Sequence, residues 1–368
     1  MEIEVLQEKL ARALTVVSRV AMGAKATLPI LSNVLIKAEG NKVSLTATNL
    51  DMAVVDYVPV TSSKDGVITV PARILAEFVQ NLPKGEKVKI KVDGNKVKIK
   101  AGKYSSIING TPQDDFPELP EINKEKSVAD KMGVDEFKVG VSEVIVAASG
   151  DTTRPALTGV YFNTNENVLY IAATDGYRLA EKRFIKKVES EVAAIVPTAS
   201  LQEVLRSITD DVDEIDIIFD DTQVRFRLGE LEITSKLIDG TFPDYRKLIP
   251  ENTDIQIIID RAELSRIVKM AALFARESNR VICCTADAKK KVFTVSSISN
   301  EVGENESEIE VEVDKDGSVK LDSRFLADAL NVLDEDKISF GFFLKPAPIL
   351  LTNEKGDDYR HMITILDN

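Results

Sequence analysis

Six segments of the chain carry apolar residues at every third or fourth position, and this spacing predicts six amphipathic helices. They cover residues 6–21, 72–84, 134–148, 198–209, 260–277 and 323–333. Between them, short runs rich in Val, Ile and Leu predict strands, among them residues 28–36, 42–48, 67–70, 157–162, 168–172 and 194–197. Residues 88–92 and 96–100 alternate apolar and Lys positions around Asp93-Gly94-Asn95, which predicts a hairpin.

This order of elements occurs three times. Pro71 and Pro197, which each end a strand before a helix, lie 126 positions apart, and the pairs Phe116-Pro117 and Phe242-Pro243 have the same spacing. The period exceeds that of common solenoid repeats, so each copy is expected to be a whole domain. We therefore predict an α+β fold of three repeated domains, each with two helices and antiparallel sheets, at residues 1–126, 127–250 and 251–368.

The composition of the chain limits the kinds of protein to which it can belong. Hydrophobic residues make up 44% of the chain and charged residues 29%, as is typical of a folded globular protein. No apolar run suits a membrane helix, and no signal peptide is expected. Cys283 and Cys284 are neighbours on a predicted strand and point to opposite faces, so a reducing cytoplasm fits better than a disulfide framework. His361, the single histidine, is expected at a strand surface. A zinc site or a Cys/His nucleophile pair is nearly excluded, and we predict no cofactor.

The net charge of −13 repels nucleic acid on average, so contact with nucleic acid needs a local reversal of charge. If the first helix is counted with its flanking residues, as 5–25, the predicted helix segments sum to +3, which leaves −16 on strands and loops. Basic helices beside acidic strands are one interpretation, and charge scattered over solvated faces is the other. Lysines at positions 87, 89, 91, 96, 98 and 100 share the outer face of one hairpin, where they discourage edge pairing.

No catalytic constellation or phosphate-binding glycine loop emerges from the sequence, so we predict that the protein is not an enzyme. Carboxylates cluster at residues 114–115 and 210–214, but without the spacing of a calcium loop. We interpret both clusters as acidic connectors. The rival hypothesis is a hydrolase that uses them with a metal.

Three stretches are specific enough to suggest a family. They are Thr27-Leu28-Pro29-Ile30-Leu31-Ser32-Asn33, Ala173-Thr174-Asp175-Gly176-Tyr177-Arg178-Leu179-Ala180, and Phe242-Pro243-Asp244-Tyr245-Arg246-Lys247-Leu248-Ile249-Pro250. In the second stretch, Asp175-Gly176 predicts a tight turn after an apolar strand. Together with the threefold repeat, they closely resemble the bacterial sliding clamps, the beta subunits of DNA polymerase III, along the whole chain.

The resemblance implies a processivity factor that is not an enzyme. It implies a DNA clamp fold and a head-to-tail homodimeric ring in the cytoplasm, with the sheets outside and the helices around duplex DNA. Such a ring tethers the replicative polymerase and repair proteins through short peptides and is opened by a clamp loader. Among the family's DNA contacts, Lys25 carries over. With the basic residues of the helices, the candidate DNA-binding set is Lys25, Arg12, Arg19, Arg73, Lys138, Arg266 and Lys269.

The resemblance also implies a partner-peptide pocket formed by Leu157, Thr174, Gly176, Tyr177, Arg178, Leu179, Pro243, Lys247, Leu248 and Met362. The subunit junction is expected at Phe78, Leu82, Ala271, Leu273 and Phe274. The tail Met362-Ile363-Thr364-Ile365-Leu366 lacks the Pro and Arg that are usual in the family. That departure, and the net charge of −2 on residues 134–148, leave open a diverged clamp-like scaffold that binds partner proteins without encircling DNA.

Overall fold

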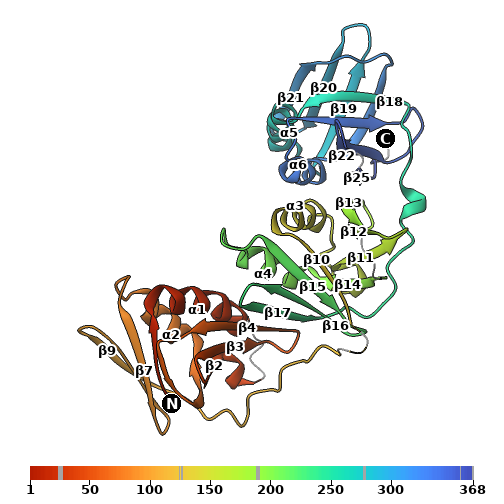
Figure 1. Cartoon of the computed structure of the whole chain (residues 1–368). Helices are drawn as coiled ribbons and strands as arrows, with labels where there is room; N and C mark the ends of the chain where they lie inside the picture. The colour runs from red at the N-terminus through yellow and green to blue at the C-terminus, as the bar shows by residue number, and fades with distance from the viewer. Residues whose placement is uncertain are drawn as a thin grey trace. The chain divides into compact units, whose positions relative to one another are not determined.

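The computed structural model describes residues 1–23, 28–123, 125, 127–187, 191–276, 279–356 and 358–366 (Figure 1). The chain divides into two compact units. The first contains Met1–Val134 and Ala199–Leu237, and the second contains Asp135–Thr198 and Ile238–Asn368. No helix in the described ranges is long and apolar enough to span a membrane.

The six predicted helices are confirmed in the described part of the chain. They are α1 Gln7–Met22, α2 Ala72–Gln80, α3 Val134–Ile145, α4 Thr198–Ser207, α5 Arg261–Ala275 and α6 Ser323–Val332. Two of them begin at an aspartate cap: the carboxylates of Asp260 and Asp322 accept hydrogen bonds of 2.8 Å from the backbone N–H groups of Glu263 and Arg324. The described residues also form three short 3₁₀ helices: η1 Pro29–Ser32, η2 Pro155–Leu157 and η3 Arg246–Leu248.

The described residues of the first unit form two antiparallel sheets. One has the order β5-β1-β7-β8-β9, and the other has the order β10-β15-β16-β17-β4-β3-β2-β6. Their strands are β1 Glu2–Leu6, β2 Asn33–Glu39, β3 Lys42–Thr48, β4 Met52–Pro59, β5 Ser62–Lys64, β6 Gly66–Pro71, β7 Lys87–Asp93, β8 Lys96–Ala101, β9 Tyr104–Asn109, β10 Val128–Gly133, β15 Glu214–Phe219, β16 Gln223–Leu228 and β17 Leu231–Lys236.

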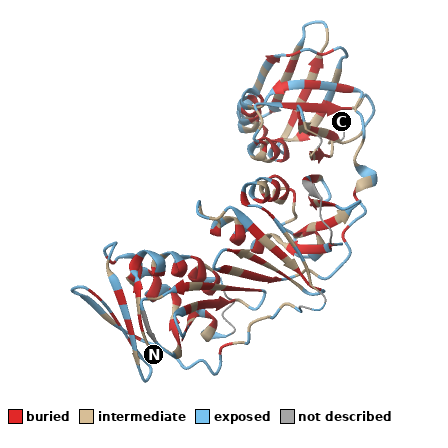
Figure 2. Ribbon diagram, viewed as in Figure 1, coloured by how far each residue is buried: buried red, intermediate tan, exposed pale blue. Residues whose placement is uncertain are grey.

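The second unit repeats this plan. An eight-stranded sheet has the order β14-β11-β12-β13-β25-β24-β23-β18, and a four-stranded sheet has the order β21-β20-β19-β22. The strands are β11 Gly159–Asn165, β12 Val168–Thr174, β13 Arg178–Lys187, β14 Ala193–Pro197, β18 Ile255–Asp260, β19 Val281–Asp287, β20 Val292–Ser299, β21 Gly303–Glu310, β22 Gly317–Asp322, β23 Lys337–Phe342, β24 Ile349–Asn353 and β25 Tyr359–Ile363. Buried residues alternate with exposed ones along many of the strands (Figure 2).

Neighbouring repeats are joined edge to edge by their sheets. β4 of the first repeat pairs with β17 of the second, and β13 of the second repeat pairs with β25 of the third. We call these two pairings the first and the second seam. The sequence pattern predicted each repeat as a domain with antiparallel sheets of its own. Four-stranded halves instead fuse across each seam, because a strand edge with open N–H and C=O groups is completed by the next repeat.

Three local expectations were wrong. Residues 28–36 were predicted as one strand, but Pro29 opens the helix η1 and β2 begins only at Asn33. A proline has no N–H for a sheet ladder and suits the first turn of a helix. Residues 157–162 were also predicted as one strand, but Leu157 belongs to the helix η2 and β11 begins only at Gly159. His361 is fully buried and does not lie at a strand surface, because β25 lies inside the sheet between β13 and β24.

Candidate functional site

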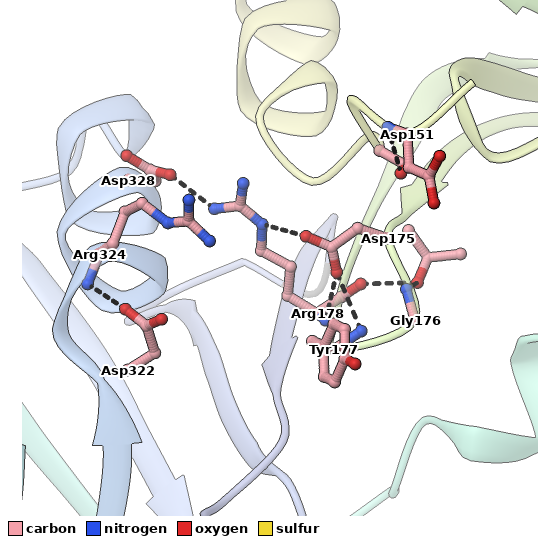
Figure 3. Close-up of polar contacts among 10 residues, drawn as sticks. Asp151, Asp175, Gly176, Tyr177, Arg178, Asp322, Arg324 and Asp328 are labelled. Atoms are coloured by element: carbon pink, nitrogen blue, oxygen red, sulfur yellow. Dashed lines mark hydrogen bonds and ion pairs between the residues drawn. The ribbon is translucent and has the colours of Figure 1, made fainter. Parts of the chain in front are cut away.

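The turn between β12 and β13 is built by side chains that bond to its own backbone (Figure 3). The hydroxyl of Thr174 accepts from the N–H of Gly176 at 3.0 Å and donates to the carbonyl of Arg178 at 2.6 Å. The carboxylate of Asp175 accepts from the N–H groups of Tyr177 and Arg178 at 2.9 and 3.0 Å. Gly176 has φ 92°, a value that favours glycine. The predicted tight turn is confirmed.

The first repeat has the same turn at Thr48, Asn49 and Leu50. The hydroxyl of Thr48 accepts from the N–H of Leu50 at 3.1 Å and donates to the carbonyl of Met52 at 2.9 Å. The side chain of Asn49 accepts from the N–H of Met52 at 2.8 Å, and Leu50 has φ 75°. The turn geometry therefore belongs to the repeated scaffold. What distinguishes the second repeat is the set of side chains that the turn presents.

Arg178 is a positioning residue. Its guanidinium pairs with Asp175 at 3.1 Å and with Asp328, 150 residues along the chain on α6, at 2.7 Å. Only 9% of its side chain is exposed, and it lies 4.6 Å from the ring centroid of Phe325. Tyr177 is 64% exposed and stacks on the same Phe325 ring at 6.4 Å. Arg178 thus holds the turn against α6, and Tyr177 carries the exposed surface.

The apolar residues of the predicted pocket divide into a floor and a rim. Leu157, Leu179 and Met362 form the floor, since each is only 5–8% exposed and all three belong to one core cluster. Leu248, on η3, forms the rim and is 65% exposed. Exposed Pro243 and Lys247 lie on the same segment as Leu248. Met362 is 5% exposed, so the structure places it in the floor and not at the rim.

A pocket of about 640 Å³ lies beside Tyr177, which is one of its lining residues. Its lining includes Arg154, Arg280, Arg324, Phe325 and Leu366. None of these residues belongs to the site that was predicted from the sequence. Arg154 and Arg280 are 126 residues apart but do not hold equivalent places, because β19 begins directly after Arg280 and β11 begins only at Gly159. Phe325 had the spacing of an ordinary core residue of a helix.

The candidate DNA-binding cations are not equivalent. Arg19 is paired with Glu203 at 2.6 Å and its side chain is only 28% exposed, so it serves the first seam. Arg12 pairs with Asp211 at 3.3 Å, and Arg73 pairs with Glu77 at 2.8 Å. Lys138, Arg266 and Lys269 are exposed and make no ion pair within the described ranges. Lys25 lies outside the described residues.

The candidate junction residues also divide by exposure. Leu273 is 58% exposed, and Phe78 and Phe274 are half-buried. Leu82 and Ala271 are buried at 5% and 0% exposure. Both pack inside their own repeats, so they can hold the exposed junction residues in place but do not themselves form the junction surface.

Carboxylates do not gather into a metal site in the described ranges, where no group of three or more His, Cys, Asp or Glu residues could hold an ion. Asp211 is engaged by Arg12 and by the hydroxyl of Thr209. These contacts fit the interpretation of residues 210–214 as an acidic connector.

Three family models match the chain in succession. They describe the N-terminal domain of the DNA polymerase III beta subunit at residues 1–120, its central domain at residues 131–244 and its C-terminal domain at residues 246–366. The beta sliding clamp of Staphylococcus aureus (strain Mu50) is 31% identical over 352 residues, which cover 92% of each chain.

Solved structures match the whole fold. The DNA polymerase III subunit beta of Pseudomonas aeruginosa has a TM-score of 0.93 and 28% identity, with 100% of both chains covered. The DNA polymerase sliding clamp of Bacillus subtilis has a TM-score of 0.93 and 27% identity, with 100% of this chain and 99% of that chain covered. A Pseudomonas aeruginosa sliding clamp bound to griselimycin has a TM-score of 0.94 and 27% identity, with both chains covered completely.

Proposed function

This chain belongs to the DNA polymerase III beta subunit family and has its function, that of a sliding clamp and processivity factor in DNA replication, and we propose that it acts as a head-to-tail homodimer around duplex DNA. Its three clamp domains are of the α+β class. The protein performs no chemistry itself and works in the cytoplasm. The observation that supports the homodimer is that two strand edges take no part in the two seams.

The seams follow one rule. In each, the third strand of a repeat's first sheet (β4 or β13) pairs with the last strand of the following repeat (β17 or β25). For the third repeat, the rule requires that its third strand, β21, pair with the last strand of a following repeat. The last strand not yet used in this way is β9 of the first repeat. In the described residues, β21 pairs only with β20, and β9 pairs only with β8. A second copy completes both edges if β21 of one subunit pairs with β9 of the other, which is a heterologous contact that closes.

The repeats also give the register of this contact. Asp56 on β4 lies opposite Leu45 within its repeat, and Ser307 on β21 lies opposite Val295 in the same way. Asp56 faces Leu231 across the first seam. Leu231 is the first residue of β17 and pairs with Leu228 across the turn between β16 and β17. In the same way, Tyr104 is the first residue of β9 and pairs with Ala101 across the turn between β8 and β9. Ser307 is therefore expected opposite Tyr104 of the partner subunit, and Glu306 opposite Ser105 of the partner subunit.

Side chains on both edges suit this pairing. Leu273 on α5, Ile74 on α2 and Ile107 on β9 are 58%, 56% and 60% exposed, and apolar surface of this extent gains stability when it is covered. The charges are complementary, because alternate residues of β21 are glutamates and alternate residues of β8 are lysines. They are Glu304, Glu306 and Glu308 on β21 and Lys96, Lys98 and Lys100 on β8. The lysine face discourages wrong edge pairing and favours this one.

Cysteine cross-linking tests the dimer and its register together. A Ser105→Cys, Glu306→Cys chain is expected to form a covalent dimer on oxidation, because directly opposed residues meet the short Cβ separation that a disulfide needs. A Ser105→Cys, Glu308→Cys chain shifts the pair by two residues and is the matched control. Light scattering at micromolar concentration should give the mass of two chains. A monomer at low and moderate salt, or equal cross-linking of both variants, would contradict the proposal.

Contact with DNA is proposed through exposed cations of the helices, among them Lys138, Arg266 and Lys269. Such contacts bind phosphate without reading sequence and weaken with salt. The topological part of the proposal is tested by retention after loading: a ring stays on closed circular DNA and is lost from linear ends. A diverged scaffold that binds partners without encircling DNA is favoured by the acidic first turn of α3, with Asp135 and Glu136, and predicts no difference between circles and linear DNA.

Partner proteins are proposed to bind as short peptides over the floor formed by Leu157, Leu179 and Met362. A preformed apolar floor with a few polar groups at its edge suits two or three apolar side chains of a peptide. Gly176 lets a peptide backbone approach the turn closely. A clamp from Pseudomonas aeruginosa was solved bound to griselimycin, which supports a ligand site in this family.

A further inference from the structure

A second, smaller pocket of about 200 Å³ lies at the first seam, where β4 pairs with β17. Its apolar lining consists of Val16, Val212, Leu228 and Leu231. Three acids also line it, Asp56, Asp211 and Glu230, and the basic residue among its described lining residues is Arg12. The pocket therefore combines apolar walls with more negative than positive charge.

Asp56 is the buried end of this pocket. Only 2% of the residue is exposed, whereas Arg12, Asp211 and Glu230 are exposed and form the mouth. Within the described residues, Oδ1 of Asp56 makes no hydrogen bond. The guanidinium of Arg12 pairs with Asp211 at 3.3 Å instead. A buried carboxylate in this situation gains from a cation that enters the pocket from outside.

At the second seam, an ammonium group occupies the place that Asp56 holds at the first. Lys182 lies on β13 at the position equivalent to Asp56 on β4, 126 residues later. Only 10% of its side chain is exposed, and its Nζ lies 2.8 Å from a carboxylate oxygen of Glu143 and 2.8 Å from one of Asp358. The repeated scaffold therefore accommodates a buried ammonium between carboxylates at this place.

The equivalence of the two seams extends to the surrounding acids. The N–H of Tyr57 donates to the carbonyl of Glu230 at 3.1 Å, and the N–H of Arg183 donates to the carbonyl of Asp358 at 2.7 Å. Each donor directly follows the seam position of its strand, so Glu230 is the counterpart of Asp358. Lys42 pairs with Glu230 at 3.1 Å, but Lys42 does not line the pocket. The first seam thus sets two carboxylates where the second sets a carboxylate and an ammonium.

We propose that the pocket at the first seam binds a primary alkylammonium group, with the ammonium on Asp56 and the alkyl chain against the apolar walls. An ammonium has three donors and no acceptor, so it can bond to Asp56 and to a second carboxylate at the same time, as Lys182 does. Apolar side chains can cover the methylene groups behind it. Such a group is supplied either by a free amine or by a lysine side chain of another protein.

Other ligands suit the pocket less well. In the described ranges, no group of three or more His, Cys, Asp or Glu residues could hold a metal ion, and a hard divalent cation needs more oxygen ligands than Asp56 and Glu230 supply. An anion would be repelled by the excess of carboxylates at the mouth. A bare monovalent ion would leave the apolar walls without a partner.

Isothermal titration calorimetry of the full-length protein tests the proposal at pH 8, where Asp56 is ionised. The probes are butylammonium chloride, its neutral twin butanol, and Nα-acetyl-lysine methylamide, which presents the ammonium as a lysine does. Ionic strength is held constant with sodium chloride. Asp56→Asn and Glu230→Gln each remove one negative charge with little change of shape. Asp114→Asn is the matched control, because it is an exposed acid of the same unit outside the pocket.

Butylammonium is expected to bind the parent chain with a dissociation constant on the order of 1 mM, and butanol at least about tenfold more weakly. Asp56→Asn should weaken butylammonium at least about tenfold, and Asp114→Asn less than about twofold. Glu230→Gln should weaken it by a smaller factor than Asp56→Asn. Because Glu230 is exposed, its variant keeps the test valid if Asp56→Asn does not fold. Binding of the lysine probe as well supports a lysine side chain as the source, and binding of butylammonium alone supports a free amine.

Three results overturn the inference. The first is no binding of butylammonium to the parent chain, or equal binding of butylammonium and butanol. The second is unchanged affinity in both Asp56→Asn and Glu230→Gln. The third is binding that appears only after Arg12→Gln, because Arg12 would then turn from Asp211 and serve as the cation for Asp56.

Discussion

Lys182 on β13 occupies the same position in the second repeat that Asp56 on β4 occupies in the first, 126 residues earlier. Asp56 pairs with Leu45 and faces Leu231 across the first seam, and Lys182 pairs with Ile171 and faces Tyr359 across the second. Lys182 has two partners, the carboxylates of Glu143 and Asp358, each at 2.8 Å. Asp56 is 2% exposed, and one of its carboxylate oxygens has no hydrogen-bond partner.

In the described residues, the first seam therefore buries a carboxylate that makes no ion pair, whereas the second seam pairs the ammonium of Lys182 with two carboxylates. Burial raises the pKa of Asp56 from 3.8 to about 6, against an opposing influence of Arg12. The folded state holds this proton more tightly than the unfolded chain does, so Asp56 costs stability as pH rises from 3.8 to 6, and the cost stays constant above that. A shift of this size corresponds to about 3 kcal/mol.

Asp56→Asn is expected to raise the free energy of unfolding of the first unit by about 2 kcal/mol at pH 8, because the amide needs no charge in the sheet. The gain should be smaller by about 1 kcal/mol at pH 5.5, where Asp56 is largely protonated in the folded state. Urea unfolding at both pH values measures it. Asp114→Asn, an exposed residue of the same unit, is the control. If Asp56→Asn lowered the free energy of unfolding instead, the ionised carboxylate of Asp56 would be stabilising the folded state.

The buried imidazole of His361 predicts a loss of stability in mild acid. Burial lowers the pKa of His361 from 6.5 to about 3, with a further contribution from Arg178, and the ring accepts or donates a 2.8 Å hydrogen bond with Tyr359. The neutral ring is required in the folded state, so stability is present above pH 6.5 and is lost as pH falls toward 3. Between pH 7.5 and 5.5 the loss from this group is about 1.4 kcal/mol.

His361→Gln isolates this loss, because His361 is the single histidine and Gln does not titrate. The variant is expected to be less stable at pH 7.5, since it disturbs a buried position, but its stability should fall less than that of the parent chain between pH 7.5 and 5.5. The comparison of the two slopes removes the contribution of carboxylates common to both chains. Parallel slopes would mean that the imidazole titrates alike in the folded and unfolded chains.

Leu248 and Met362 predict opposite outcomes for the same substitution. Leu248→Asp places a charge on an exposed rim, so peptide affinity should fall at least about tenfold while the free energy of unfolding changes by less than about 0.5 kcal/mol. Met362→Asp buries a carboxylate in the core cluster and should cost several kcal/mol. Peptide titration and thermal unfolding of both variants measure this. Normal peptide affinity in Leu248→Asp would remove η3 from the site.

Arg266 and Lys269 on α5 predict how DNA retention depends on charge. The Arg266→Glu, Lys269→Glu chain should leave closed circular DNA faster than the parent chain, most clearly at low salt where screening is weak. Lys289→Glu, Lys345→Glu changes the net charge equally on exposed loop residues and is the control. Equal release from both variants would assign the effect to total charge, and unchanged release would exclude this face of α5 from DNA contact.

Much of the fold was predictable because helices leave a periodic pattern in the chain. The six helices and the threefold order follow from apolar spacing alone. The seams did not follow, because β4 and β17 pair through backbone groups of segments far apart in the chain, and side-chain alternation does not identify the neighbour of an edge strand. The depth of β25 inside its sheet was hidden for the same reason, which explains the error at His361.

The candidate site shows a similar limit. Asp175-Gly176 predicted a turn because those residues favour its backbone angles. The sequence did not predict that Arg178 reaches Asp328, since the two are separated by 150 residues. Nor did it distinguish Met362 from Leu248, because both are simply apolar in the chain. Only packing makes one the floor and the other the rim.

The two junctions of the proposed dimer also have a genetic consequence. A subunit in the proposed dimer offers two different edges, β9 and β21, so a dimer contains two junctions, and each junction uses one edge from each copy. When a cell makes an intact copy together with a copy damaged at β21 alone, every mixed dimer keeps one sound junction and has one weak one. Such an allele is expected to act through half-weakened rings, with a severity that depends on the ratio of the two copies.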